Sequence, residues 1–317
     1  GRCVDRRERR GSRREPGTPR GPPTSTLSNM AEEEYAVEEV SDEEKLQIAQ
    51  HFLLSSPPAQ FGEVLEDVRK LLPAGLLNDP LAAGIARAYH TKTSKVVTAP
   101  SGEQTLLTAA TEVDPTHYVN PSTGEVFAVD HLTLNTSSDG RGGAPEISGD
   151  ALARRDALQA ALATYLSEHF EGAEGKGATV APKGSDLVIN ITGERPNLRN
   201  YWSGSWTSEW TVTPGGDVTG EIKLHAHYFE DGNVQLQTTK PVPLVSLSGA
   251  PDALAAAVVN HIKQTESGLQ AALQDMFSSM SEETFRGMRR VLPVTRQKME
   301  WNSAAHHVVR NLRATPK

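Results

Sequence analysis

Residues 176–248 constrain the fold most, because they form a nearly continuous series of β-strand patterns. Alternating apolar and polar residues predict about five strands, near residue 180 and at 187–191, 201–212, 218–229 and 234–245. Asp231-Gly232, between the last two, is the strongest hairpin signal in the chain. The fourth strand places two sets of side chains on opposite faces: Ile222, Leu224, Ala226 and Tyr228 on one, and Lys223, His225, His227 and Phe229 on the other. We therefore predict an antiparallel sheet with one packed face and one partly polar face.

The segment after the sheet predicts a long helix that covers it. Residues 252–280 carry apolar side chains at helical spacing, at Leu254, Val258, Ile262, Leu269, Leu273 and Met276. An apolar sheet face must be buried against another element. The predicted fold class is therefore α+β, with a sheet and its covering helix at residues 176–280.

Trp202, Trp206 and Trp210 recur at every fourth residue of one predicted strand. On a regular strand they share a face, where they could stack on sugars or bases. A sheet also buries aromatic side chains against its covering helix, and Gly204 indicates a bulge that would interrupt the row. We favour a core or subunit-interface position over a ligand platform.

The N-terminal part predicts three short helices. Ser41-Asp42-Glu43-Glu44 matches a capping box, and further helices are expected over residues 60–72 and from Asp79 onward. The side chains expected to be buried are Leu46, Ile48, Ala49, Phe52 and Leu53, then Phe61, Val64, Leu65, Val68, Leu71 and Leu72, then Leu81, Ile85, Ala88 and Tyr89. The tight connections predict an antiparallel helical stalk over residues 30–93.

Residues 94–175 predict a β-rich globule followed by a helix. Short strands are expected at residues 95–98, 104–109, 117–120 and 126–129, and the glycine-rich residues 139–149 are expected to form a mobile loop. A helix is predicted at residues 151–170, with core positions at Leu152, Leu158, Leu162, Tyr165 and Leu166.

No catalytic motif of the common nucleotide-binding, serine-hydrolase, zinc-protease or EF-hand types occurs in the sequence. His225 and His227 share a strand face, but no cysteine or obvious third ligand accompanies them, so we favour a solvated or interface pair over a metal site. Cys3 is the only cysteine, and no apolar run approaches the roughly 18 residues of a membrane span. The sequence predicts a non-enzymatic protein with no cofactor and no metal.

Residues 1–29 differ from the rest of the chain. They are rich in Arg, Pro and Gly, with eight Arg against three acidic residues, and should be disordered. Such a segment could bind nucleic acid or anionic lipid. Because Met30 is followed by Ala31 and three glutamates, we interpret residues 1–29 as translated leader or vector-derived sequence.

The C-terminal residues 281–317 are basic, although the whole chain has a net charge of −8. They hold eight Lys and Arg against three Glu. Two amphipathic helical stripes are expected on either side of Pro293, at Phe285, Met288 and Leu292, then at Val294, Trp301, Ala305, Val308 and Leu312. We favour a partner-binding tail over a solvated charged face.

Several blocks resemble the α subunit of the F-actin capping protein (CapZ) family: SDEEK at 41–45, DVRKLL at 67–72, NYWSGSWTSEW at 200–210, HYFEDGNVQL at 227–236 and LPVTRQKMEWN at 292–302. They follow the family's order and spacing from Met30 to about Asn302. The resemblance implies a three-helix stalk, a β-rich globule, a five-stranded antiparallel sheet under a long helix and, at residues 281–317, a mobile amphipathic tentacle.

The family resemblance implies a cytoplasmic, cytoskeletal heterodimer with a capping protein β subunit. It caps the barbed end of an actin filament and blocks subunit addition and loss without severing or catalysis. The actin-binding residues implied are Arg286, Arg289, Arg290, Arg296, Lys298 and Trp301. Arg286 and Arg290 also match the phosphoinositide-sensitive patch. Two departures stand out: Ser303 to Ala305 replace bulkier family residues, and Arg286 stands where Lys is common.

The resemblance suggests further partners, namely phosphoinositides, CARMIL-type peptides, myotrophin and dynactin. An alternative function is a structural subunit of a larger cytoskeletal assembly, dynactin-like or ciliary, that caps an actin or actin-related filament. A carbohydrate-binding module that uses the Trp row is the least favoured reading.

Overall fold

The computed structural model describes residues 40–138, 149–230 and 233–279. Every element described below lies in one compact unit that begins at Ser41. Several predicted features lie outside the described residues: the extension 1–29 and the start at Met30, most of the loop 139–149, the turn Asp231-Gly232, and the tail 281–317.

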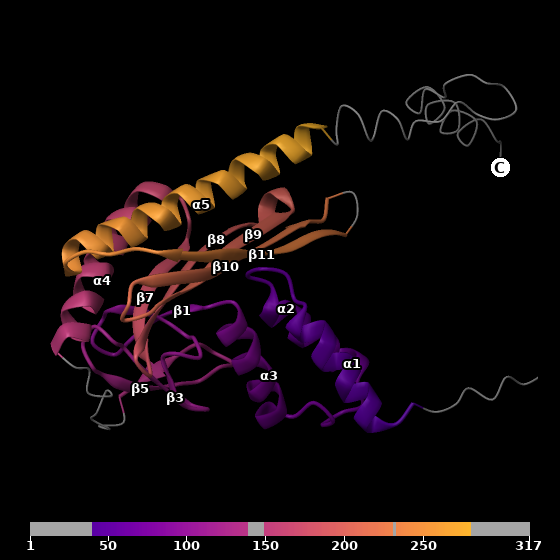
Figure 1. Ribbon diagram of the computed structural model, residues 1–317. Coiled ribbons are helices and arrows are strands. Elements are labelled where there is room, and N and C mark those ends of the chain that lie inside the picture. The colour runs from indigo at the N-terminus through magenta and orange to yellow at the C-terminus, as the bar shows by residue number, and fades with distance from the viewer. Residues whose placement is uncertain (1–39, 139–148, 231–232, 280–317) are drawn as a thin grey trace, which may run out of the picture. The chain divides into compact units, whose positions relative to one another are not determined.

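Three helices form the first part of the fold, as predicted: α1 (Asp42–Leu54), α2 (Phe61–Leu71) and α3 (Asp79–Lys92) (Figure 1). The capping box is confirmed, because the Ser41 hydroxyl accepts a hydrogen bond from Glu44 N–H at 3.3 Å and Ser41 N–H donates to Glu44 Oε2 at 2.9 Å. The helices share a core made of Leu53, Phe61, Leu65, Leu77, Ala82, Ala86 and Tyr89.

Part of the predicted buried face of these helices is exposed. Ile48 and Phe52 on α1 are 52% and 58% exposed, and Leu71 at the end of α2 is 85% exposed. Leu81 and Ala88 on α3 are also exposed, so the prediction of burial was wrong for these five residues. Ala49 and Leu53 make the stripe that faces the core, and Ile48 and Phe52 lie about 100° away around the helix.

Two small antiparallel sheets follow α3. One pairs β1 (Val96–Thr98) with β2 (Gln104–Leu106), and the other has the order β3 (Glu112–Asp114), β4 (His117–Val119), β5 (Val126–Val129), β6 (Thr136–Ser137). β3 and β6 were not predicted, because strands of three and two residues are too short to show a period of two.

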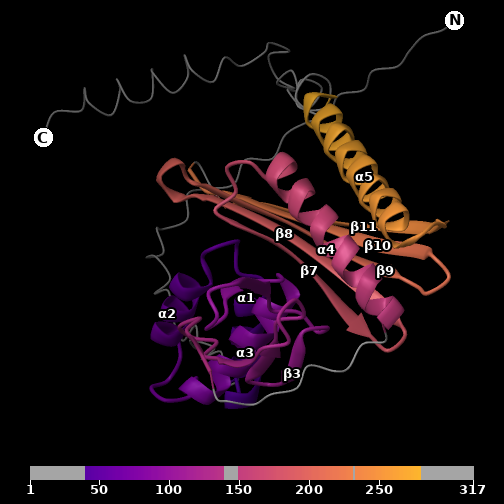
Figure 2. The same ribbon diagram turned by 90° about the vertical axis from the view of Figure 1, so that its left-hand side faces the viewer.

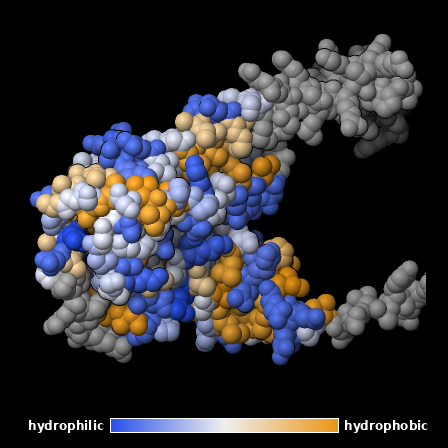
Figure 3. All heavy atoms as spheres, in the orientation of Figure 1, coloured by the Kyte–Doolittle hydropathy of each residue, from blue (hydrophilic) through white to orange (hydrophobic). Residues whose placement is uncertain are grey.

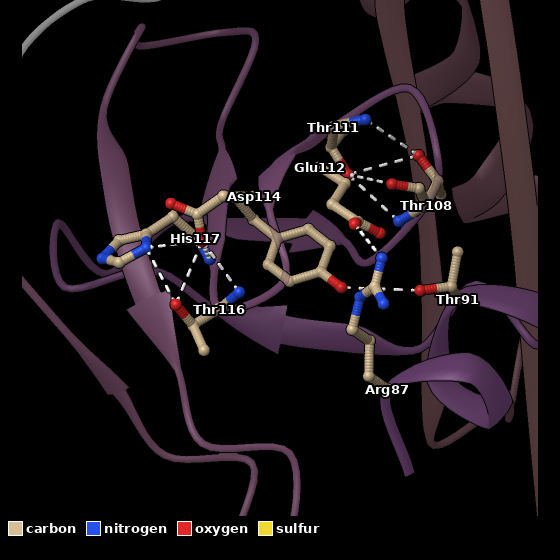
Figure 4. A network of polar contacts seen from close by, with 9 residues as sticks. Arg87, Thr91, Thr108, Thr111, Glu112, Asp114, Thr116 and His117 are labelled. Carbon is tan, nitrogen blue, oxygen red and sulfur yellow. Dashed lines mark hydrogen bonds and ion pairs between the residues drawn. The ribbon is translucent and has the colours of Figure 1, made fainter. Parts of the chain in front are cut away.

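A polar network joins α3 to the second small sheet (Figure 4). Arg87 donates a hydrogen bond to Glu112, and Thr91 Oγ1 lies 3.4 Å from the hydroxyl of Tyr118. The turn between β3 and β4 is closed by Asp114, which accepts from the backbone N–H groups of Thr116 and His117. These hydrogen bonds lower the pKa of Asp114, and the bond from the Thr116 N–H has the largest effect.

The main sheet has five antiparallel strands in the order β11-β10-β9-β8-β7. Their bounds are β7 (Gly175–Lys183), β8 (Asp186–Asn197), β9 (Trp202–Val212), β10 (Asp217–Tyr228) and β11 (Val234–Ser246), with a short 3₁₀ turn η1 (Leu198–Asn200) before β9. Helices α4 (Gly149–His169) and α5 (Pro251–Ser279) cover one face (Figure 2). The α+β prediction is thus confirmed.

The covering helices bury most of the predicted positions. Leu158, Leu162, Tyr165, Leu254, Val258, Ile262 and Leu269 are buried in one core cluster with the sheet, and Leu166 and Leu273 pack against that cluster. Leu152 and Met276 are 40% and 38% exposed, so their predicted burial was wrong. Leu152 lies about 120° around α4 from Leu158, so it faces away from the cluster, and Met276 lies in the last turn of α5, beyond Leu273.

The Trp row packs into this core. Trp210 is fully buried and Trp206 packs against the cluster, which confirms the core reading for both. The bulge expected at Gly204 is absent, because pairing with β8 and β10 runs through Gly204 without a shift. The described irregularity of the sheet lies instead between β10 and β11, at Val218 and Gly220.

Two histidines are buried between α3 and the loop after β5. His90 and His131 are 4% and 5% exposed, their rings stack at 5.9 Å, and His90 Nδ1 and both nitrogens of His131 have no hydrogen-bond partner among the described residues. Burial, with smaller contributions from His131 and Lys95, lowers the pKa of His90 to about 3. Burial also lowers the pKa of His131.

We expect this pair to make the fold acid-sensitive. Below the unfolded-state pKa of about 6.5, the unfolded chain binds protons that buried His90 cannot, so stability falls as the pH is lowered. Between pH 7 and pH 5 His90 alone should cost about 2 kcal/mol. Thermal melts across this range should show a smaller fall for His90→Gln than for the exposed control His51→Gln. Equal falls for both variants would contradict the expectation.

Candidate functional site

Helix α5 leads from the sheet to the predicted partner-binding tail, and a buried carboxylate anchors it. Glu266 on α5 is 4% exposed. It accepts hydrogen bonds from the hydroxyl of Tyr165 on α4 at 2.5 Å and from the hydroxyl of Ser208 on β9 at 2.6 Å. One side chain therefore joins both helices to the sheet, in addition to the apolar contacts of α5 with the core.

Two opposing effects act on the pKa of Glu266. Burial raises its pKa, whereas hydrogen bonds from Ser208 and Tyr165 favour the charged form. The indole N–H groups of Trp206 and Trp210 act in the same direction as those hydroxyls, although neither meets hydrogen-bond geometry. Glu266 is not among the site residues predicted from the sequence. The available signal was a charged side chain on the same helical stripe as Ile262 and Leu269.

The second feature is apolar surface that the described chain leaves uncovered. Near its end, α5 exposes Met276 and Phe277, the latter at 53%, and β11 exposes Val234 and Leu244 at 61% and 60%. Figure 3 shows a further gathering of hydrophobic residues over α1 and α2, where Ile48, Phe52 and Leu71 are exposed. Exposed apolar side chains that gather on one surface are typical of protein interfaces.

The sheet face opposite α4 and α5 is polar. His227 is buried there, with Nδ1 3.0 Å from Gln60 Nε2 and Nε2 3.1 Å from Asn233 Oδ1. His225 Nε2 lies 3.0 Å from Gln235 Oε1, so each ring is held by amide side chains. Among the described residues, no group of three His, Cys, Asp or Glu side chains is arranged to hold a metal ion.

A polar cleft of about 700 Å³ lies along this face, between β1, the end of α3 and the sheet. Lys95 and Glu194 form an ion pair of 2.5 Å inside it. The cleft contains no residue that the sequence marked as a site, apart from His225 in its lining. In the described part of the chain no helix is long and apolar enough to cross a membrane.

The predicted actin-binding and phosphoinositide-binding residues all lie outside the described part of the chain. They are Arg286, Arg289, Arg290, Arg296, Lys298 and Trp301. Helix α5 is described as far as Ser279, and the first of these residues, Arg286, follows it in the sequence. The site residues therefore remain predictions.

Comparison with known proteins identifies the family of this fold. A family model described as the F-actin capping protein alpha subunit matches residues 49–311. The chain belongs to this family. The match runs from the second half of α1 through α2, α3, the sheet and α5 to most of the basic tail.

Two relatives match most of this chain, and the match covers nearly the whole length of each relative. The F-actin-capping protein subunit alpha of Dictyostelium discoideum is 33% identical, over 86% of this chain and 98% of the relative. The corresponding protein of Caenorhabditis elegans is 34% identical, over 84% of this chain and 96% of the relative.

A solved structure supports the fold assignment. The homodimeric actin capping protein alpha subunit from Plasmodium berghei has a TM-score of 0.63 at 18% identity, and the match covers 79% of this chain and 98% of that one. At this identity the likeness concerns the fold alone.

Proposed function

We propose that this chain is the alpha subunit of a heterodimeric actin capping protein. In this proposal it binds filament barbed ends and blocks subunit addition and loss, with no severing and no catalysis, in the cytoplasm and cytoskeleton. The observation that carries the proposal is the family match over residues 49–311. The motif-free sequence is in keeping with a structural, actin-binding role.

The uncovered apolar surfaces support an obligate partner. Burying a large apolar side chain contributes roughly 1.5–3 kcal/mol. Phe52, Leu71, Val234 and Leu244 are each more than half exposed in the single chain. A β subunit that covered the stalk helices and the β11 side of the sheet would recover this free energy and would account for the exposure of Phe52 and Leu71, which the sequence predicted to be buried.

The basic tail supplies the proposed filament contact. Actin is acidic, so Arg286, Arg289 and Arg290 can steer the encounter and orient the complex. Exposed ion pairs contribute only about 0–1 kcal/mol each, whereas a nanomolar complex requires about −12 kcal/mol. The apolar stripe that includes Trp301 therefore has to contribute, and a second tail from the partner would add avidity.

The decisive test is filament elongation. We expect nanomolar heterodimer, prepared by co-expression with a capping protein β subunit, to stop actin addition at barbed ends while pointed-end growth continues. Elongation from spectrin–actin seeds and from gelsolin-capped seeds reports the two ends separately. Unchanged barbed-end growth with an intact heterodimer would refute the proposed function.

Regulation through Arg286 and Arg290 is a separate proposal. Vesicles that contain phosphoinositides should relieve capping, and neutral vesicles should not.

The alternative function, a subunit of a dynactin-like or ciliary assembly, predicts that the whole cellular pool co-fractionates with that assembly. CARMIL-type peptides and myotrophin remain proposed partners.

A further inference from the structure

A pocket of about 310 Å³ lies between α4, α5 and the sheet, and Glu266 is part of its lining. The other lining residues come from α4 and the residue after it, from β9 and β10, and from α5. The volume is near the lower end of the range for ligand pockets. The pocket therefore suits a small molecule or a single side chain.

Aromatic rings form much of the pocket wall. Tyr165 on α4 is buried, the ring of His169 stacks on it at 4.6 Å, and the ring of Phe170 meets it edge-on at 6.0 Å. Trp206 on β9 contributes a fourth ring from the side of the sheet. The faces of aromatic rings attract ammonium groups and also bury carbon chains. The wall therefore favours a cation with an apolar body.

The carboxylate in this lining has no counter-ion among the described residues. Glu266 is 4% exposed, no Lys or Arg belongs to the lining, and Lys263, three residues before it on α5, pairs with Glu168 instead. Buried charges in proteins are usually paired with an opposite charge. The missing component of this pocket is therefore a cation.

The Glu266 carboxylate also keeps acceptor sites for a further donor. A carboxylate has about four such sites. The described hydrogen bonds use one on each oxygen, from the Tyr165 hydroxyl to Oε2 at 2.5 Å and from the Ser208 hydroxyl to Oε1 at 2.6 Å. An ammonium nitrogen carries three donors, and its bonds to a carboxylate are stronger than those between neutral groups.

We propose that this pocket binds an alkylammonium group, with the nitrogen at the Glu266 carboxylate and the carbon chain among the rings of Tyr165, Phe170 and Trp206. Free amines and lysine side chains both carry this group, so the same chemistry fits a small metabolite and a protein partner. The assignment goes beyond the proposed capping function and does not depend on it.

The test measures binding of n-butylammonium to the full-length chain in its purified oligomer by titration calorimetry. We expect saturable binding with a Kd of about 1 mM or tighter, which a ligand of this size can reach. n-Butanol has a similar shape without the charge and should bind at least about tenfold more weakly. Glu266→Gln keeps an acceptor for Tyr165 but removes the charge, and it should weaken n-butylammonium binding at least about tenfold.

Two further variants separate the pocket from general electrostatics. Glu168→Gln removes an exposed carboxylate of α4 that is not part of the lining, so binding should stay within about twofold of the original value. Leu273→Trp fills the pocket without changing the carboxylate and should abolish binding. Thermal melts show whether each variant is folded.

Three results would overturn the assignment: equal binding of n-butylammonium and n-butanol, unchanged binding by folded Glu266→Gln, or no saturable binding up to about 20 mM. A capped Gly-Lys-Gly peptide distinguishes the two sources of the group. Binding as tight as that of n-butylammonium assigns the pocket to a lysine of a partner protein, and no binding assigns it to a free amine. Amine binding by a protein that fails to cap filaments would refute the proposed function alone.

Discussion

Charge reversal of Arg286, Arg289 and Arg290 to Glu is expected to weaken barbed-end capping about 100-fold. Each reversal replaces attraction to an acidic surface with repulsion, and an exposed pair is worth up to about 1 kcal/mol, so three changes amount to about 3 kcal/mol. The effect should appear in the association rate and shrink as salt is added, because long-range steering is screened. Seeded elongation at two ionic strengths measures both quantities.

A matched control separates this effect from total charge. Lys176 and Lys183 lie on β7, at the sheet edge opposite β11, and Lys263 on α5 faces Glu168 of α4, so their reversal to Glu changes the net charge equally without touching the tail or the stalk helices. We expect this variant to cap within about threefold of the original protein. The heterodimer should co-purify in both cases. A control variant that caps as weakly as the tail variant would remove the tail from the proposed site.

Replacement of Trp210 by Ala is expected to lower the free energy of unfolding by about 3–5 kcal/mol. Trp210 has no exposed surface, packs in the main core and meets the His261 ring edge-on at 5.8 Å. Trp202, at the start of the same strand, is only partly buried, so Trp202→Ala should cost much less. Thermal unfolding of the heterodimer measures both variants, and equal losses would contradict the core assignment.

The space for this ring comes from a glycine on the neighbouring strand. A methyl group on Gly220 would lie 2.4 Å from Cε3 of Trp210, so Gly220→Ala should cost about 2 kcal/mol by overpacking. At Gly204 the nearest atom would be 3.9 Å away, which makes Gly204→Ala a control in the same sheet. The combination of Gly220→Ala with Trp210→Leu should cost less than the sum of the two single changes.

The element types followed from local sequence. The period of two predicted the five long strands, the period of 3.6 predicted the helices, and the capping box at Ser41 marked the start of α1 to the residue. These signals are local because a strand or a helix repeats over a few residues. The same patterns support the α+β class and, with the block resemblance, the family.

Tertiary contacts decided what each side chain meets. The periodicity of α1 cannot tell that Ala49 faces the core while Phe52 remains exposed, because that depends on where α3 packs. In the sequence, Glu266 only interrupts an apolar stripe. The structure shows that it accepts hydrogen bonds from Tyr165 and Ser208.

Strand β11 also separates what local sequence predicts from what tertiary contacts decide. Sequence alone predicted a strand at residues 234–245, and it shows that residues 281–317 are basic. Only the tertiary structure placed β11 at the edge, oriented its peptide groups and put Pro243 in a bulge opposite β10. Strand order and register depend on contacts between residues far apart in the chain, which no local pattern encodes.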